Sequence, residues 1–162
     1  MHQHVSVQSA DFNVSDELAA LRRADLGVGA VASFVGTVRD TNGPGAAGGI
    51  SRMELEHYPG MTERAIEAMI EQALQRFDIR AARVVHRVGV LQPGEQIVLV
   101  AVAGAHRGQA FQACEFLMDY LKTQAPFWKK ETTAAGAHWV DARVADDAAL
   151  ARWGIQVSNA AL

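Results

Sequence analysis

A proline within a lysine-rich stretch places the strongest constraint on how this chain can fold. The stretch spans residues 121–131 and reads LKTQAPFWKKE. Pro126 fixes its own φ and disfavours the helical region for Ala125. The sequence therefore predicts that a helix ends just after Lys122 and that the chain then turns.

The same stretch sets three lysines around two aromatic side chains. Lys122 precedes the turn, and Lys129 and Lys130 follow it. Phe127 and Trp128 are costly to leave in water, so we expect the turn to be packed against the protein. Ammonium groups that are held by packed backbone suit an anion site. If Lys129 and Lys130 continue as a strand, their side chains point to opposite faces, and only one of them faces the site with Lys122.

The composition is that of an ordinary globular domain without a general affinity for anions. The chain has 162 residues, with 15 Lys and Arg against 18 Asp and Glu, so its net charge is −3. Binders of nucleic acid or acidic membranes normally carry a basic excess, so we expect neither partner. We expect one domain over residues 1–154 and a C-terminal tail over 155–162. No apolar run approaches the ~20 residues that span a bilayer, and no signal peptide is evident, so a cytoplasmic location is expected.

Cysteine and histidine usage argues against a metal or disulfide framework. The single cysteine, Cys114, excludes an internal disulfide and a multi-cysteine metal site. It lies on the apolar stripe of a predicted helix, where a free cysteine is commonly a small buried hydrophobe rather than a nucleophile. The six histidines show no zinc-type spacing, so we expect no bound metal.

Hydrophobic periodicity predicts interleaved strands and helices. Strands are expected around Val5, at 30–39, 50–58, 84–90, 97–102, 127–132 and 138–140. Helices are expected at 15–24 with Ser15 as the cap, through an apolar stripe from Ile66 to Phe77, over 108–122, and up to Trp153. Strands 84–90 and 97–102 should form a hairpin through a turn at 92–95, and the glycine-rich segment 41–49 should be a mobile loop. Without a regular βαβ repeat, an α+β fold is favoured.

Lys122 can be interpreted either as a functional residue or as one partner of a surface ion pair. Glu115, Asp119 and Lys122 share one polar helix face, and a surface ion pair between Asp119 and Lys122 would be worth only ~0.2–0.5 kcal/mol. A helix C-terminus stabilises a cation, and the packed turn brings further lysines close in sequence. Spacing alone favours the surface ion pair, whereas the position of Lys122 at the helix end favours the functional interpretation.

A second group of cations lies between a strand and the next helix. His106 and Arg107 occupy that junction, where unpaired N–H groups and the helix dipole favour an anion. Arg107 can hold a phosphate bidentately, and His106 can donate or accept a proton near neutral pH. Solvent-exposed side chains at a helix start are an equally good interpretation. Arg39 ends a buried strand, where a charged residue is unusual unless it is paired or binds something.

Four strings in the chain resemble the large, catalytic subunit of molybdopterin synthase. They are FVGTVRD at 34–40, LEHYPGMT at 55–62, AHR at 105–107 and the LKTQAPFWKKE stretch, in the family's order. The resemblance runs from roughly Val5 to Trp153. It implies an α/β hammerhead fold with an additional α+β subdomain. It also implies a homodimer that binds two copies of a small ubiquitin-like sulfur-carrier subunit, which together form a heterotetramer.

The resemblance also implies an activity and its substrates. The small subunit ends in Gly-Gly, and its C-terminal thiocarboxylate donates sulfur to cyclic pyranopterin monophosphate, also called precursor Z. Two transfers give the dithiolene of molybdopterin, and the enzyme itself requires no cofactor. A non-catalytic adaptor for a ubiquitin-like tail and a phosphate-ligand binding protein are the alternatives from other classes.

The family's functional residues can be carried over to matching positions. Lys122 and Lys129 are expected to be catalytic. The expected substrate pocket consists of Thr37, Val38, Arg39, His106, Arg107, Lys122, Lys129, Lys130 and Glu131.

Overall fold

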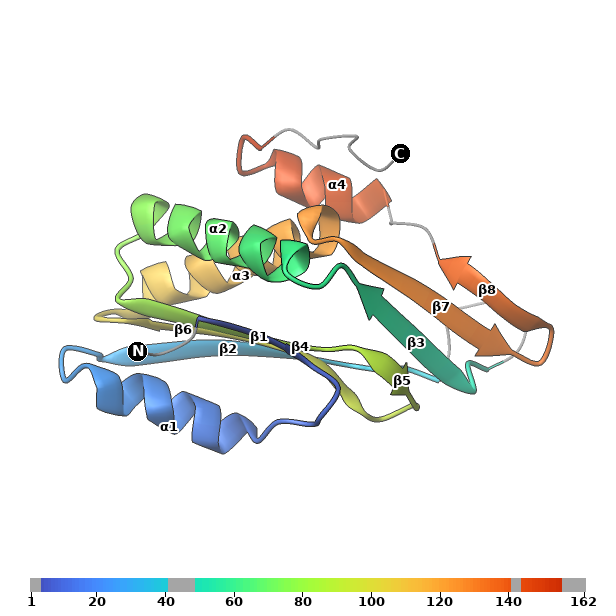
Figure 1. Cartoon of the computed structure of the whole chain (residues 1–162). Helices are drawn as coiled ribbons and strands as arrows, with labels where there is room; N and C mark the ends of the chain where they lie inside the picture. The colour runs from blue at the N-terminus through green and yellow to red at the C-terminus, as the bar shows by residue number, and fades with distance from the viewer. Residues whose placement is uncertain (1–3, 41–48, 141–143, 156–162) are drawn as a thin grey trace.

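The strands of the protein form two four-stranded sheets (Figure 1). The computed structural model describes residues 4–40, 49–140 and 144–155, with backbone alone for 144–147. The first sheet has the order β1-β4-β6-β2, and the second has the order β5-β3-β7-β8. Helices and strands are mixed along the chain, which confirms the expected α+β class.

The first sheet carries the main core. It consists of β1 (Val5–Gln8), β4 (Ala81–Arg87), β6 (Gln96–Gly104) and β2 (Ala30–Thr37). β1 pairs in parallel with β4, while β4 and β2 pair with β6 in antiparallel fashion. The second half of β6 is buried throughout, because helices cover both faces of this sheet.

Helices lie on opposite faces of the first sheet (Figure 1). α2 (Met61–Arg76) and α3 (Arg107–Gln124) pack their apolar stripes on one face, and α1 (Val14–Ala24) packs a smaller apolar cluster on the other. The short α4 (Val144–Ala151) contacts α3. None of the described helices is long and apolar enough to cross a membrane.

The second sheet extends away from the helices (Figure 1) and is antiparallel throughout. Its strands are β5 (Gly89–Leu91), β3 (Arg52–His57), β7 (Phe127–Thr133) and β8 (Gly136–Val140). Side chains alternate between its two faces, so one face can be buried and the other exposed. The buried face contributes to a third apolar cluster, which contains Val38, Met53, Leu55 and Leu91.

The helix α3 ends as the proline requires. It continues to Gln124, two residues beyond the expected end at Lys122. Ala125 is then extended, with φ −76° and ψ 130°, which confirms the effect expected of the following Pro126. The difference of two residues is ordinary for a helix end.

Two other expected boundaries are wrong by small amounts. The cap of α1 is Asn13 rather than Ser15, because the Asn13 side chain accepts a hydrogen bond of 3.1 Å from the backbone N–H of Asp16. β2 ends at Thr37, so Arg39 lies beyond the strand rather than at its end.

The expected hairpin forms, but its connection is longer than the sequence indicated. β4 and β6 pair as expected, yet Gly89, with φ 91°, turns the chain into β5, which pairs with β3 in the second sheet. The expected turn at 92–95 forms, with the Glu95 N–H donating to the Gln92 carbonyl at 3.0 Å. Because the apolar pattern of β4 continues through Val90, periodicity alone does not indicate this switch between sheets.

The expected mobile loop and the expected C-terminal tail fall largely outside the described residues. Of the glycine-rich segment 41–49, the structure describes Gly49, which is exposed. Of the tail 155–162, it describes Ile155, which packs against the main core.

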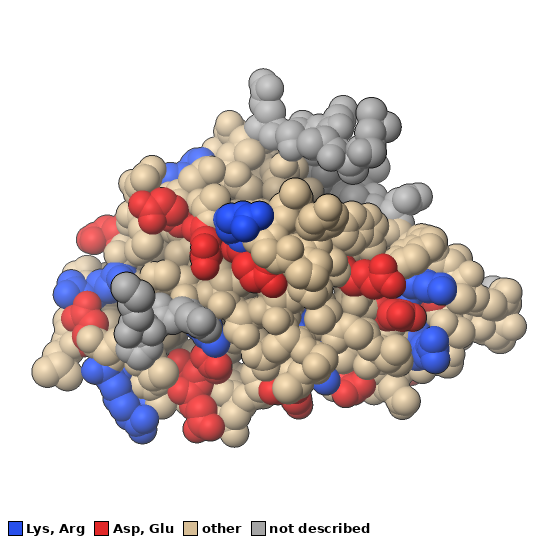
Figure 2. Space-filling model, viewed as in Figure 1, with Lys and Arg blue, Asp and Glu red and all other residues tan. Residues whose placement is uncertain are grey.

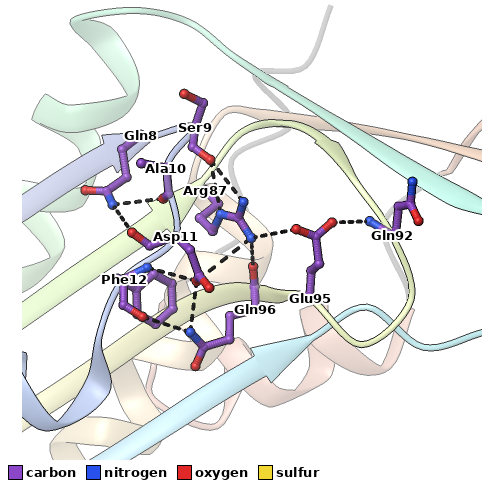
Figure 3. Close-up of polar contacts among 9 residues, drawn as sticks. All are labelled: Gln8, Ser9, Ala10, Asp11, Phe12, Arg87, Gln92, Glu95 and Gln96. Atoms are coloured by element: carbon purple, nitrogen blue, oxygen red, sulfur yellow. Dashed lines mark hydrogen bonds and ion pairs between the residues drawn. The ribbon is translucent and has the colours of Figure 1, made fainter.

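A buried arginine joins three segments at one end of the first sheet (Figure 3). Arg87, at the end of β4, donates from Nε and Nη2 to the carbonyl of Ser9 at 3.2 and 3.1 Å. Its Nη1 donates to the carbonyl of Gln96 at 3.1 Å and lies 3.5 Å from Glu95 Oε1 and 3.9 Å from Asp11 Oδ1. The side chain is only 8% exposed, so these partners replace its water. The backbone around Arg87 is therefore held on several sides.

Replacing Arg87 should destabilise the protein more than replacing an exposed arginine. Arg87→Met leaves the carbonyls of Ser9 and Gln96 without their donor, so we expect a loss of about 2–4 kcal/mol in the free energy of unfolding. Arg52→Met is the control, because Arg52 lies 3.8 Å from Glu54 on the surface and should matter by no more than about 0.5 kcal/mol. Urea unfolding of both variants checks this, and equal midpoints would contradict it.

Candidate active site

Only one of the two aromatic side chains in the turn between α3 and β7 is packed against the protein. The Phe127 ring stacks on the ring of His86 in β4, with centroids 3.8 Å apart and planes 18° apart. Trp128 is 47% exposed, so the expectation that both aromatic residues are packed is correct for Phe127 and wrong for Trp128. The reason is that successive side chains of a strand point to opposite faces.

A buried threonine fastens the same turn from another side. Thr62, in the first turn of α2, is fully buried, and its hydroxyl donates to the Pro126 carbonyl at 3.0 Å. The same hydroxyl accepts from the Tyr58 N–H at 2.9 Å. The segment LEHYPGMT is thus bonded directly to the aromatic turn. Thr62 lies in the string LEHYPGMT, but no local pattern in the sequence indicates this role.

The two lysines of β7 point to opposite faces, as expected. Lys129 pairs with Leu55, which is buried, whereas Lys130 pairs with Glu54 on the other face. The Lys130 ammonium lies over the Trp139 ring, 5.7 Å from its centroid. Lys129 therefore shares a face of β7 with Phe127, and Lys130 does not.

A buried carboxylate accompanies Lys129. Glu131 is 1% exposed and pairs with Met53 on the buried face. Its Oε1 lies 3.6 Å from Lys129 Nζ, and the side chain of Lys129 is itself only 34% exposed. Burying a carboxylate is costly unless a cation or hydrogen bonds compensate it, so Glu131 holds the Lys129 ammonium in place.

His86 is a buried titratable group beside the turn. It is 8% exposed, and its Nδ1 lies 2.8 Å from the Arg87 carbonyl, which can only accept, so Nδ1 carries the proton. Burial, with a smaller contribution from the nearby charges of Lys122 and His57, lowers the pKa of His86 to about 4. The ring is therefore neutral at neutral pH. His86 cannot be identified as a site residue from the sequence alone, because a histidine within a strand is an unspecific signal.

Lys122 does not form the surface ion pair that the spacing allowed. Asp119 Oδ2 accepts from the Trp153 indole N–H at 2.8 Å and lies 3.8 Å from an Arg152 nitrogen. Among the residues that the structure describes, no carboxylate lies within 4 Å of the exposed Lys122 ammonium. Its positive charge nevertheless contributes to the lowered pKa of His86, so the Lys122 ammonium lies in the neighbourhood of the His86 ring.

The second cation group lies at the far end of α3. His106 is the N-cap of this helix and Arg107 its first residue, and both are exposed. At about 1.5 Å per residue, Arg107 is about 22 Å from Lys122 along the helix. α3 runs back along β6, since Cys114 Sγ lies 3.9 Å from the Val100 carbonyl. One chain therefore does not bring His106 and Arg107 together with Lys122.

Arg39 lies at the same end of the first sheet as His86. Thr37 pairs with Gln96 at the start of β6, and His86 pairs with Val98 close by. Thr37 and Arg39 are both exposed. The structure thus places Arg39 at the Lys122 end of the molecule, as the expected pocket requires.

Val38 is a core residue in this chain. Its side chain is 3% exposed. Its N–H donates to the Glu95 carbonyl at 2.9 Å, and its carbonyl accepts from the Gly94 N–H at 2.8 Å. Any part that Val38 plays in the pocket is therefore limited to packing beneath it.

Cys114 is buried, as its place on the apolar helix stripe predicted. Cys114 lies in the main core, and burial raises the pKa of its thiol to about 11, so it is not a nucleophile at neutral pH. Among the described residues no three His, Cys, Asp or Glu side chains are grouped as metal ligands. Figure 2 shows charges of both signs interspersed over one face of the molecule, without a broad basic surface there.

Acid should destabilise the protein through His86. Its pKa of about 4 in the folded state is below the ordinary value of 6.5, so between these pH values the unfolded chain binds a proton that the folded chain does not. The stability from the neutral ring is therefore present above pH 6.5 and is lost as the pH falls toward 4. The loss is about 3 kcal/mol, since a pKa difference of one corresponds to about 1.4 kcal/mol.

Urea unfolding at several pH values measures this effect. The fall in unfolding free energy from pH 7 to pH 4 should be smaller in His86→Phe than in the unaltered protein, because phenylalanine does not titrate. His138→Phe, at an exposed position on β8, is the matched control and should keep the full pH dependence. Identical pH dependence in all three proteins would contradict this account of His86.

Comparisons with known proteins identify the family of this chain. Residues 7–124 match the family model described as MoaE protein. The chain is 62% identical over 156 residues to the molybdopterin synthase catalytic subunit of Ralstonia nicotianae, covering 96% of this chain and 87% of the relative.

Solved structures give the same result. The molybdopterin biosynthesis MoaE protein from Burkholderia ambifaria superposes with a TM-score of 0.80 at 55% identity, covering 94% of this chain and 98% of that one. A complex of subunits 1 and 2 of molybdopterin-converting factor from Helicobacter pylori shares the fold, with a TM-score of 0.69 at 19% identity over 86% of this chain and 91% of that one. The chain therefore belongs to the MoaE family, that of the catalytic subunits of molybdopterin synthase.

Proposed function

We propose that this chain transfers sulfur to cyclic pyranopterin monophosphate, with Lys122 and Lys129 as the catalytic groups. The donor is the C-terminal thiocarboxylate of a small ubiquitin-like subunit that ends in Gly-Gly, and the product is the dithiolene of molybdopterin. The observation that carries this proposal is the turn itself. The charge of Lys122 helps to lower the pKa of His86, and the His86 ring stacks on Phe127. Phe127 in turn lies on the same face of β7 as Lys129.

The chemistry of the two substrates suits such a pair of ammonium groups. One substrate carries a phosphate and the other a thiocarboxylate, so both are anions that repel each other in water. Lys122 and Lys129 attract both and hold them together. Sulfur comes from the small subunit, so a core position for Cys114 is consistent with the reaction. That the enzyme needs no cofactor stays a prediction.

Each charged residue then has a part that follows from its position. Lys122 stabilises the charge that develops at the terminal carbonyl of the donor, and it can donate a proton. Lys129, held by Glu131 at 3.6 Å, acts on the cyclic phosphate as its ring opens. Arg39 contributes to phosphate binding from its position two residues beyond the end of β2.

A homodimer accounts for His106 and Arg107. These residues lie about 22 Å from Lys122 along α3, so a pocket that uses all of them draws on two chains. In a two-fold symmetric dimer the start of α3 in one chain can approach the end of α3 in its partner. The Helicobacter pylori structure is a complex of subunits 1 and 2, which supports a second kind of subunit, so we propose a heterotetramer. The cytoplasmic location stays a prediction.

The two lysines of β7 should differ sharply in turnover. Lys122→Ala and Lys129→Ala should each lower the rate of dithiolene formation by about 100-fold or more, as expected for the loss of a group that stabilises developing charge. Lys130→Ala is the matched control on the opposite face and should stay within about threefold. The assay mixes each variant with thiocarboxylated small subunit and cyclic pyranopterin monophosphate.

Melting temperature and binding of the small subunit show whether each variant is folded. Near-normal turnover by Lys122→Ala would refute its catalytic role. A loss in Lys130→Ala as large as that in Lys129→Ala would refute the assignment by face. Binding of the small subunit by the unaltered chain without any product would favour an adaptor.

Mixed dimers test whether two chains share one pocket. Arg107→Ala and Lys122→Ala chains carry different tags, and dimers with one chain of each kind are purified. If Arg107 and Lys122 of different chains form one pocket, each mixed dimer has one intact pocket and should recover about half of the wild-type turnover. If each pocket uses a single chain, the mixed dimer should be as inactive as its parents.

A further inference from the structure

His86 is a titratable residue that lies beside the site and that the proposed chemistry does not use. It belongs to β4 in the first sheet, whereas its stacking partner Phe127 begins β7 in the second sheet. The rings are nearly parallel, with centroids 3.8 Å apart. This stack is therefore a direct contact between the two sheets at the point where the chain leaves α3.

The position of the His86 ring is fixed by its surroundings. Its Nδ1–H donates to the Arg87 carbonyl at 2.8 Å. The guanidinium of Arg87 is in turn bonded to the carbonyls of Ser9 and Gln96 (Figure 3). A ring bonded to such a clamped backbone has little freedom to turn or shift.

Phe127 occupies the centre of the segment that carries the two lysines. Lys122 lies five residues before it and Lys129 two residues after it. Thr62 holds the adjacent Pro126 carbonyl from α2, at 3.0 Å. His86 supports the turn from the opposite sheet, so the turn is held between two fixed groups.

The charged groups around His86 favour an uncharged ring. Lys122 approaches from α3 and His57 from β3, and both oppose a positive charge on His86. The nearest carboxylate to His57 is Glu63 of α2, with 3.5 Å between His57 Nε2 and Glu63 Oε1. A neutral ring can thus lie under the turn without repelling the Lys122 ammonium.

We propose that His86 is a positioning residue for sulfur transfer. Its ring is the fixed surface on which Phe127 rests, and through Phe127 it sets the relative placement of Lys122 and Lys129. This inference rests on the proposed roles of the two lysines. Reacting groups that are misplaced by about 1 Å can cost about 100-fold in rate, so a small shift of Phe127 has a measurable effect.

The test compares two replacements of His86. His86→Phe keeps an aromatic ring for the stack, and its kcat should stay within about threefold of wild type. His86→Leu keeps an apolar side chain but loses the stack, and its kcat should fall about tenfold or more with KM for cyclic pyranopterin monophosphate little changed. A purely structural residue would lower the melting temperature without lowering kcat per folded molecule.

A double-mutant cycle with Phe127→Leu identifies the route of the effect. If His86 acts through Phe127, Phe127→Leu alone should lose as much kcat as His86→Leu, and the double variant should be no worse than either. Phe127→Leu also serves if His86→Leu does not fold, because it leaves His86 in place. Additive losses, or wild-type kcat in a folded His86→Leu or Phe127→Leu variant, would overturn the proposal.

Lys122→Ala, measured in the same assay, separates this inference from the proposed function. If Lys122→Ala is inactive while both leucine variants are fully active, only the positioning role of His86 is refuted. If Lys122→Ala is itself active, the catalytic assignment is refuted, and the inference drawn from it falls as well.

Discussion

The abrupt end of α3 is the constraint on which the rest of the site depends. Pro126 removes one backbone donor and forces Ala125 into an extended conformation, so the helix cannot continue. The chain passes there from the helical layer on the first sheet into β7 of the second sheet. Lys122 and Lys129 lie on the two sides of this junction, and their relative placement is set by how firmly it is held.

Two contacts between distant segments hold the junction. The Thr62 hydroxyl bonds the Pro126 carbonyl, and the His86 ring supports Phe127. Both groups are buried, and both are secured by further bonds within their own segments. The backbone that carries Lys122 and Lys129 is therefore rigid, although their side chains are flexible. The rigid backbone limits the entropy lost when anionic substrates bind.

Local rules predicted the parts of this arrangement that depend on nearby residues. The end of α3 near Pro126 and the opposite directions of Lys129 and Lys130 both follow from backbone geometry, and both are confirmed. The exposure of Trp128 follows from the same alternation. The hydrophobicity of Trp128 predicted a packed side chain, but strand geometry directs it to the exposed face.

Contacts between distant segments could not be predicted in the same way. Thr62 and Pro126 are 64 residues apart in the chain, and no local pattern pairs them. In the sequence, His86 is one of three polar residues of β4, and only its stack with Phe127 distinguishes it. The family strings grouped Arg107 with Lys122, but they did not show that α3 separates the two within one chain. Burial of Val38 likewise depends on packing by the second sheet.

Lysine side-chain NMR during a titration with cyclic pyranopterin monophosphate tests the central claim most directly. If Lys122 and Lys129 form one anion site, their side-chain resonances should shift together, with the same dissociation constant, while those of Lys130 stay unchanged. The resonances of Lys130 are expected to stay unchanged because Lys130 lies on the other face of β7. Shifts of Lys122 and Lys130 without Lys129, or different dissociation constants for Lys122 and Lys129, would contradict the account.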